Sequence, residues 1–168
     1  MYQKMTSIVP PLDYVLDVRA EMKPVKISQN STPQGKSYYF QFIGGYIRST
    51  NGELDIPLQP TFDDAFLPAD ADVVSLRVTA VGYDQKSGDY FQARNNGFLS
   101  LSDVKGEANS ISEYGNSNCT GNFTIQTGNK EWAWLNTSVL VGPGRFGYDE
   151  NGDIVWVEYK VFRVRSTW

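Results

Sequence analysis

Hydrophobic and polar residues alternate with a period of two along much of the chain. Residues 12–22 alternate loosely, and residues 73–83 and 154–165 are rich in the β-branched and aromatic residues typical of strands. No segment carries an apolar stripe at the helical spacing of three to four residues over several turns. The chain is therefore predicted to fold as β-strands.

Short clusters of glycine, asparagine and serine separate the predicted strands. Asn51-Gly52 is the strongest two-residue hairpin signal in the chain, and residues 86–88, 95–97 and 128–129 predict further turns. The remaining strands are predicted at residues 37–43, 46–49, 53–58, 90–94, 98–101, 122–126 and 131–141. Eight to ten short strands joined by hairpins predict an antiparallel barrel or sandwich.

Three segments interrupt the strand pattern. Residues 57–72 hold three prolines and four aspartates, and they predict an irregular loop with a helical turn near residues 64–67. Residues 102–121 and 142–152 are rich in glycine and small polar residues and predict loops. Nothing marks a linker or a repeat, so we expect one domain over residues 1–168, with residues 1–10 as an N-terminal tail.

Composition restricts the chemistry that the chain can perform. The 168 residues include no histidine and one cysteine, Cys119, which excludes a Ser-His-Asp triad, a Cys-His pair and a histidine-ligated or multi-cysteine metal site. We expect no metal and no cofactor, so proton transfer would use Asp, Glu, Tyr, Lys or the single Cys. The 9 Phe, 10 Tyr and 4 Trp fit either ordinary β propensity or an aromatic ligand cavity.

Charge and hydropathy exclude some partners. The formal net charge of −4 and the lack of a Lys/Arg cluster argue against a nucleic-acid partner. No apolar run approaches the roughly 20 residues that span a bilayer, and residues 1–9 lack the apolar core of a signal peptide. We therefore expect a soluble cytoplasmic protein without a membrane partner.

The predicted strand at residues 131–141 places Trp132, Trp134 and Asn136 on one face. Two indoles beside an amide suit the wall of a ligand cavity, which needs flat apolar surfaces and a few fixed hydrogen bonds. In the alternative interpretation, Trp132 is partly exposed and Asn136 satisfies a buried backbone group.

The final predicted strand carries an acidic residue between aromatic ones. Glu158 shares a face with Trp156 and Phe162. If that face is internal, burial would raise the pKa of Glu158 and make it a candidate general acid. If the face is solvated, Glu158 would instead form an ion pair with Lys160.

Asp63 and Asp64 form a second acidic candidate, between Phe62 and Phe66. Two carboxylates held close together do not both ionise easily, and an aromatic surround raises a carboxyl pKa further. One of the pair would then donate a proton at neutral pH. The alternatives are a solvated turn or a helix N-cap.

Further binding candidates lie on other predicted strands. Tyr90 and Arg94 share one face, and an arginine beside a tyrosine on a barrel wall can hold an oxyanion or a carboxylate, unless that face is simply a polar exterior. Phe40 and Tyr46, before and after the Gly44-Gly45 pair, complete the candidate substrate-binding residues.

The order of several short motifs resembles a known family. The motifs are Pro11-Leu12 with Tyr14, Gly44-Gly45, Ala93-Arg94 with Gly97, Thr127-Gly128, Trp134-Leu135-Asn136 and Val141-Gly142. Together they resemble a family of small calycin-like β-barrel proteins long catalogued as a domain of unknown function. The resemblance implies a single closed antiparallel, lipocalin-like barrel with a central pocket. It also implies an acidic residue after the double-glycine strand, for which Asp63 or Asp64 is the nearest match.

Some fungal members of this family look like cofactor-free isomerases or cyclases of aromatic polyketides or prenylated phenols. The resemblance therefore implies an enzyme that performs an intramolecular acid–base rearrangement or ring closure in natural-product biosynthesis. In this hypothesis Asp64 is the preferred acid and Asp63 the alternative, with Glu158 as a further candidate. Tyr90, Arg94 and Asn136 hold oxygens, and Trp132 and Trp134 stack on rings. The alternatives are a non-catalytic carrier of a hydrophobic aromatic molecule and a homodimer formed through Trp132 and the final strand.

Overall fold

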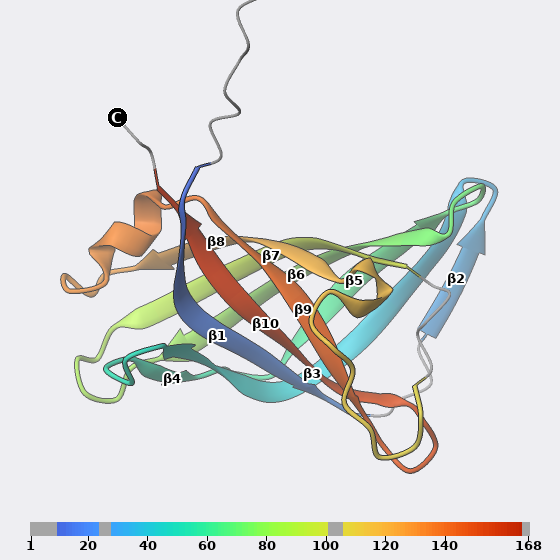
Figure 1. Cartoon of the computed structure of the whole chain (residues 1–168). Helices are drawn as coiled ribbons and strands as arrows, with labels where there is room; N and C mark the ends of the chain where they lie inside the picture. The colour runs from blue at the N-terminus through green and yellow to red at the C-terminus, as the bar shows by residue number, and fades with distance from the viewer. Residues whose placement is uncertain (1–9, 24–27, 101–105, 166–168) are drawn as a thin grey trace, which may run out of the picture.

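Ten β-strands make up most of the chain in a computed structural model that describes residues 10–23, 28–100 and 106–165. The strands are β1 (Leu12–Met22), β2 (Ser28–Thr32), β3 (Gly35–Ser49), β4 (Asp55–Pro57), β5 (Thr61–Pro68), β6 (Val73–Tyr83), β7 (Tyr90–Ser100), β8 (Thr120–Thr127), β9 (Leu140–Tyr148) and β10 (Ile154–Val164). Two short 3-10 helices, η2 (Asn116–Asn118) and η3 (Ala133–Thr137), lie in the connections (Figure 1). No helix in the described ranges has the length and apolar character needed to cross a membrane.

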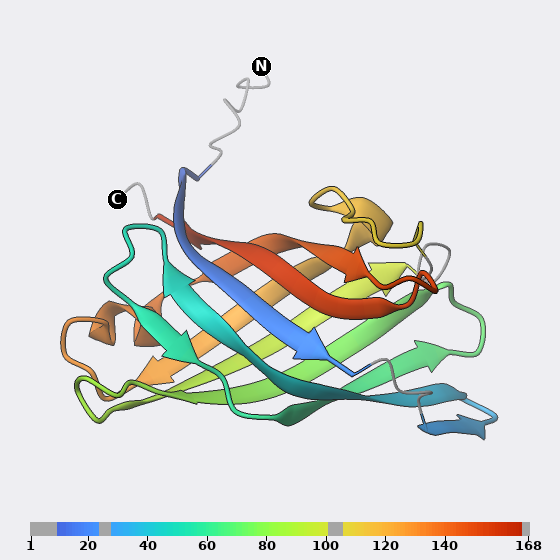
Figure 2. The same cartoon turned by 90° about the horizontal axis from the view of Figure 1, so that it is seen from below.

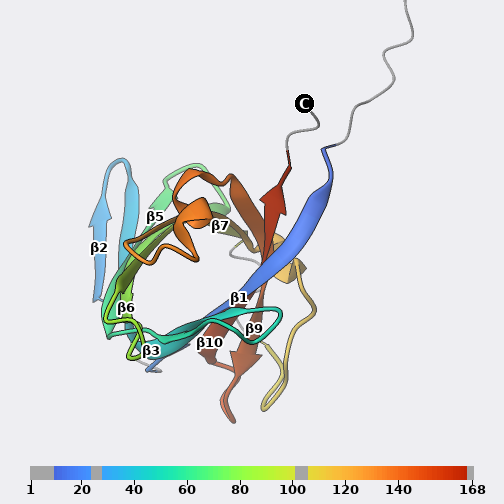
Figure 3. The same cartoon turned by 90° about the vertical axis from the view of Figure 1, so that its left-hand side faces the viewer.

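Eight of the strands close into an antiparallel barrel. Their order is β1–β10–β9–β8–β7–β6–β5–β3, and β3 pairs with β1 to complete the ring. Figure 3 shows this ring from one end. Strands β2 and β4 pair with β3 outside the ring. The structure thus confirms the predicted all-β fold, a closed calycin-like barrel.

Side chains alternate between the barrel interior and the outer surface, as period-two strands require. Packed side chains fill one half of the interior, where the fully buried residues include Leu16, Ile47, Ile125 and Leu140. Helix η3 lies at this end of the barrel (Figures 1 and 2) and contributes the buried Leu135. The opposite half, towards the end of β1 and the start of β10, holds the cavity described below.

Two predicted loops are strands. Residues 61–68 form β5, which pairs with both β3 and β6. The prolines that suggested a loop lie at strand ends, because Pro57 ends β4 and Pro68 ends β5. Residues 140–148 form β9, where a Cβ on Gly144 would lie 2.5 Å from the Cys119 Sγ. Glycine at this position allows close packing and does not mark a turn.

Two other local predictions were also wrong. Residues 131–139 are not a strand: Leu135 N–H donates to the Trp132 carbonyl at 3.0 Å, so the segment closes its hydrogen bonds locally as η3. Residues 95–97 are not a turn, because Asn95 and Gly97 pair with Phe123 and Gly121 in the middle of β7 and β8. The strands predicted at residues 12–22 and 73–83 and the turn at Asn51-Gly52 are confirmed.

Candidate functional site

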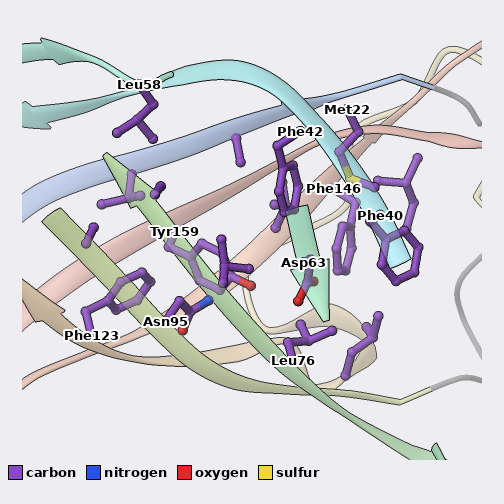
Figure 4. A pocket seen from close by; sticks show the side chains of 18 of the residues that line it. Met22, Phe40, Phe42, Leu58, Asp63, Leu76, Asn95, Phe123, Phe146 and Tyr159 are labelled. Carbon is purple, nitrogen blue, oxygen red and sulfur yellow. The ribbon is translucent and has the colours of Figure 1, made fainter. Parts of the chain in front are cut away.

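The open half of the barrel encloses a cavity of about 290 Å³. Its walls are the inner faces of the barrel strands, and most lining residues are apolar. Four phenylalanines contribute aromatic surface: Phe40, Phe42, Phe123 and Phe146. The polar lining residues are Tyr38, Asp63, Asn95 and Tyr159, and Figure 4 shows the last three pointing into the cavity. A mostly apolar cleft or cavity with a few polar groups is the usual form of a small-molecule site.

Among the described residues that line this cavity, Asp63 is the only acidic residue, and none is Lys or Arg. It faces inward because β5 alternates, and only 3% of its surface is exposed. Burial raises the pKa of Asp63 to about 6; the Arg77 backbone N–H, 3.0 Å from its Oδ1, opposes the rise, and the charge of Asp64 adds to it. Near neutral pH the carboxyl can therefore both donate and accept a proton.

The raised pKa of Asp63 predicts a pH-dependent stability. The folded protein binds this proton more tightly than the unfolded chain, whose pKa is near 3.8. The contribution to folding is complete below about pH 4 and is lost as the pH rises through about 6. Asp63→Asn is therefore expected to raise the free energy of unfolding by about 3 kcal/mol at pH 8 and to change it little at pH 4. Urea titrations at both pH values measure the difference, and an equal effect at both would contradict it.

Tyr159 on β10 anchors a second polar group in the cavity wall. The Cys119 thiol donates to its hydroxyl oxygen at 3.6 Å, and the Asn95 amide also hydrogen-bonds to it. Its ring packs edge-on against Phe123 with centroids 5.1 Å apart. Burial raises the pKa of Tyr159 well above 10, so the phenol is neutral. Burial likewise raises the pKa of Cys119 to about 11, which leaves a thiol rather than a thiolate nucleophile.

The structure brings only part of the predicted site together. Asp63 and Phe40 line the cavity. Asp64, the neighbour of Asp63, points to solvent, so the two carboxylates do not form a close inward-facing pair. Tyr90 and Arg94 are exposed on the outer face of β7, as the polar-exterior alternative held. They cannot hold an oxygen inside the barrel.

Trp132, Trp134 and Asn136 do not form a cavity face either. The two indoles pack against the core from the η3 end, with ring centroids 6.1 Å apart, and neither lines the cavity. Asn136 is exposed: its Oδ1 accepts from the Thr127 N–H at 2.8 Å, and its amide donates to the Thr127 carbonyl at 3.0 Å. This agrees with the alternative in which Asn136 satisfies backbone groups, here at the end of β8.

Glu158 lies on the outer face of β10, where it is buried beneath other side chains. Tyr46 donates to its Oε2 at 2.9 Å, Tyr114 donates to its Oε1 at 2.6 Å, and Arg145 forms a salt bridge with it at 2.6 Å. Burial alone would raise the pKa of Glu158, but these partners together lower it. Glu158 is thus an ionised structural carboxylate and not a general acid, and Tyr46 is one of its partners rather than a cavity residue.

Sequence reasoning missed Tyr159 and Asn95. Tyr159 shares the apolar face of β10 with Val157 and Val161, and that composition was a signal that the face is internal. Asn95 was hidden because Asn-Asn-Gly is a strong turn pattern. Within the described residues, no group of three or more Cys, Asp or Glu side chains is placed to hold a metal.

A closed calycin-like barrel with a mostly apolar internal cavity defines the class of this protein. Residues 10–164 match the sequence profile of DUF3237, a family described as proteins of unknown function, and the chain belongs to that family. No curated protein matches the chain significantly.

Solved structures share this fold at low sequence identity. A conserved protein of unknown function from Rhodopseudomonas palustris has a TM-score of 0.75 and 13% identity over 95% of this chain and 100% of its own. A β-barrel-like protein from Acinetobacter baumannii has a TM-score of 0.66 and 14% identity, again over 95% and 100%. An enzyme from Penicillium herquei has a TM-score of 0.59 and 12% identity over 98% and 100%. At these identities the likeness shows the fold.

Proposed function

We propose that the protein is a cofactor-independent isomerase or cyclase that acts on an aromatic polyketide or a prenylated phenol inside the barrel. The observation that carries this proposal is Asp63, a single buried carboxyl with a pKa of about 6 in a cavity walled by phenylalanines. Such a carboxyl is suited to general acid–base catalysis at neutral pH. The Penicillium herquei enzyme with the same fold supports a catalytic role.

Asp63 can act first as the general acid and then as the general base of an intramolecular rearrangement. In its protonated form it transfers the proton to an alkene or carbonyl of the substrate, leaving a carboxylate and a cationic substrate. Aromatic rings such as Phe40 and Phe42 stabilise positive charge on carbon. The substrate then loses a proton from carbon, or from a phenol oxygen that has closed a ring, and this proton returns to Asp63. The atoms of substrate and product balance, and the enzyme is regenerated.

Binding in the cavity also contributes to the rate. Folding a flexible side chain of the substrate against rigid walls holds the reacting atoms close together, which replaces an unfavourable ordering step in solution. A bound substrate would displace water from this mostly apolar cavity, which limits attack by water on a cationic intermediate.

Product formation by the purified protein tests the proposal. A panel of prenylated phenols and aromatic polyketides with an enone is incubated with the protein and no added cofactor, and isomeric products are followed by chromatography and mass spectrometry. We expect a product of unchanged mass from at least one compound. Tight binding of panel members with no product from any would favour the alternative, a non-catalytic carrier of a hydrophobic molecule.

A further inference from the structure

Three polar groups from separate strands meet at one place on the cavity wall. Tyr159 comes from β10, Asn95 from β7, and Cys119 immediately precedes β8. All three are buried, and Cys119 is fully so. A Cβ on Gly144 would lie 2.8 Å from the Tyr159 ring, so glycine on β9 is what leaves space for this phenol. The packing fixes the position of the Tyr159 hydroxyl.

The hydrogen bonds around Tyr159 leave its own proton available. Its oxygen accepts from the Cys119 thiol and interacts with the Asn95 amide. Sulfur is a weak acceptor, so the thiol is better used as the donor in this pair. A phenol whose oxygen is already occupied by such partners directs its O–H elsewhere. The remaining direction is the cavity, into which Tyr159 points (Figure 4).

Asp63 lines the same part of the cavity as this hydroxyl (Figure 4). The two side chains point towards the same space (Figure 4), and the charge of Asp63 is close enough to raise the pKa of Tyr159. No direct hydrogen bond joins these two described residues. A ligand oxygen can therefore occupy the space that Tyr159 faces while the rest of the molecule reaches Asp63.

The charge of the wall limits which ligand fits. Among the described residues that line the cavity, none is Lys or Arg. An anionic ligand would lose its hydration without gaining a counter-ion, and it would face the carboxylate of Asp63. An uncharged aromatic molecule loses little hydration free energy on entering the cavity, and its oxygen gains a hydrogen bond from a buried donor.

We propose that Tyr159, positioned by Cys119 and Asn95, donates a hydrogen bond to the carbonyl or phenol oxygen of an uncharged aromatic ligand. This inference rests on the proposed function for the aromatic nature of the ligand. It adds a binding residue to the site, and it states the orientation of the ligand and that the ligand is uncharged. Tyr159 sets which end of the ligand lies deep in the barrel, and therefore which atoms face Asp63.

A matched pair of probes tests the donor role. The probes are 2-acetylnaphthalene, whose carbonyl only accepts hydrogen bonds, and 2-isopropenylnaphthalene, in which a CH₂ group replaces the oxygen. At pH 8 Asp63 is ionised and cannot donate. We expect the wild-type protein to bind the ketone about three- to tenfold more tightly than the alkene, the usual gain from one hydrogen bond. The bound ketone should also show a carbonyl stretch at lower frequency than in hexane.

Variants of Tyr159 and Cys119 separate this role from a structural one. Tyr159→Phe should abolish the preference for the ketone and the carbonyl shift, while alkene affinity stays within about twofold, which shows an intact cavity. Cys119→Ala should reduce the preference, and Cys119→Ser, which retains a donor, should keep it. A ketone preference that persists in Tyr159→Phe would overturn the proposal. So would binding of 2-naphthoate as tightly as the ketone.

These results do not depend on turnover. Loss of the ketone preference with turnover retained would remove the role of Tyr159 and leave the enzyme hypothesis standing. A ketone preference that depends on Tyr159 in a protein without turnover would support the binding site and favour the carrier function.

Discussion

Asp63→Asn is expected to lower kcat by about 10²- to 10⁴-fold, which is the usual contribution of a general acid or base. The amide has nearly the same shape as the carboxyl and can still accept from the Arg77 N–H through its oxygen. It cannot transfer a proton. KM should therefore change little while kcat falls, and steady-state kinetics on the substrate found in the panel measure both.

Asp64→Asn is the matched control for this prediction. It makes the same chemical change one residue along the same strand, on a side chain that points to solvent. We expect wild-type turnover from it. If protonated Asp63 starts the reaction, kcat of the wild-type protein should also fall as the pH rises above about 6. Full activity in Asp63→Asn, or equal losses in the two variants, would exclude the acid role.

The inward position of Asp63 shows where sequence reasoning failed on this molecule. In β5 the pattern is inverted: Phe62 is 64% exposed on the outer face, while Asp63 and Ala65 face the interior. Alternation predicts strands well where a strand has one apolar and one polar face, as in β6. A carboxylate on the interior face, such as Asp63, breaks that rule, so the segment resembled a loop.

The same limit applies to the glycine-rich strand and the indole segment. Glycines in β9 are required by neighbours distant in sequence, such as Trp156, whose ring would lie 2.0 Å from a Cβ on Gly147. No local pattern contains that information. Conversely, residues 131–139 alternate like a strand, yet residues 133–137 form η3, whose Leu135 is buried in the core. Short alternating segments do not distinguish these outcomes.

The identity of the internal face was the main unknown for the site. Both faces of β10 contain apolar, aromatic and charged residues, so the valines beside Tyr159 were only a weak signal that its face, and not the face of Glu158, is internal. Pairing of β10 with β1 and β9 places Glu158 beside Arg19 and Arg145 on the outside. The fold class is indicated by many strands together and was predictable. Whether one site residue faces the cavity depends on the register of its own strand, and a shift of one residue would turn it outward.

Gly45→Ala is expected to lower the free energy of unfolding by about 3 kcal/mol or more. Gly45 has φ of 141°, a backbone conformation that residues with a Cβ rarely adopt. A Cβ there would lie 1.9 Å from the Arg19 carbonyl oxygen on β1. Because Gly45 pairs with Ala20 in the seam between β1 and β3, relieving this clash would separate the strands that close the barrel. Urea unfolding followed by tryptophan fluorescence measures the loss.

Gly52→Ala separates the clash at the seam from backbone strain alone. Gly52 also has a positive φ, 76°, but a Cβ there meets no atom within 4 Å. Its substitution should cost only the strain of that conformation, about 1–2 kcal/mol. If closure of the barrel shapes the cavity, Gly45→Ala should also weaken 2-acetylnaphthalene binding, because Phe42 on the cavity wall pairs with Met22 at the same seam. Equal costs for the two substitutions would mean that β3 can shift at Gly45 without opening the ring.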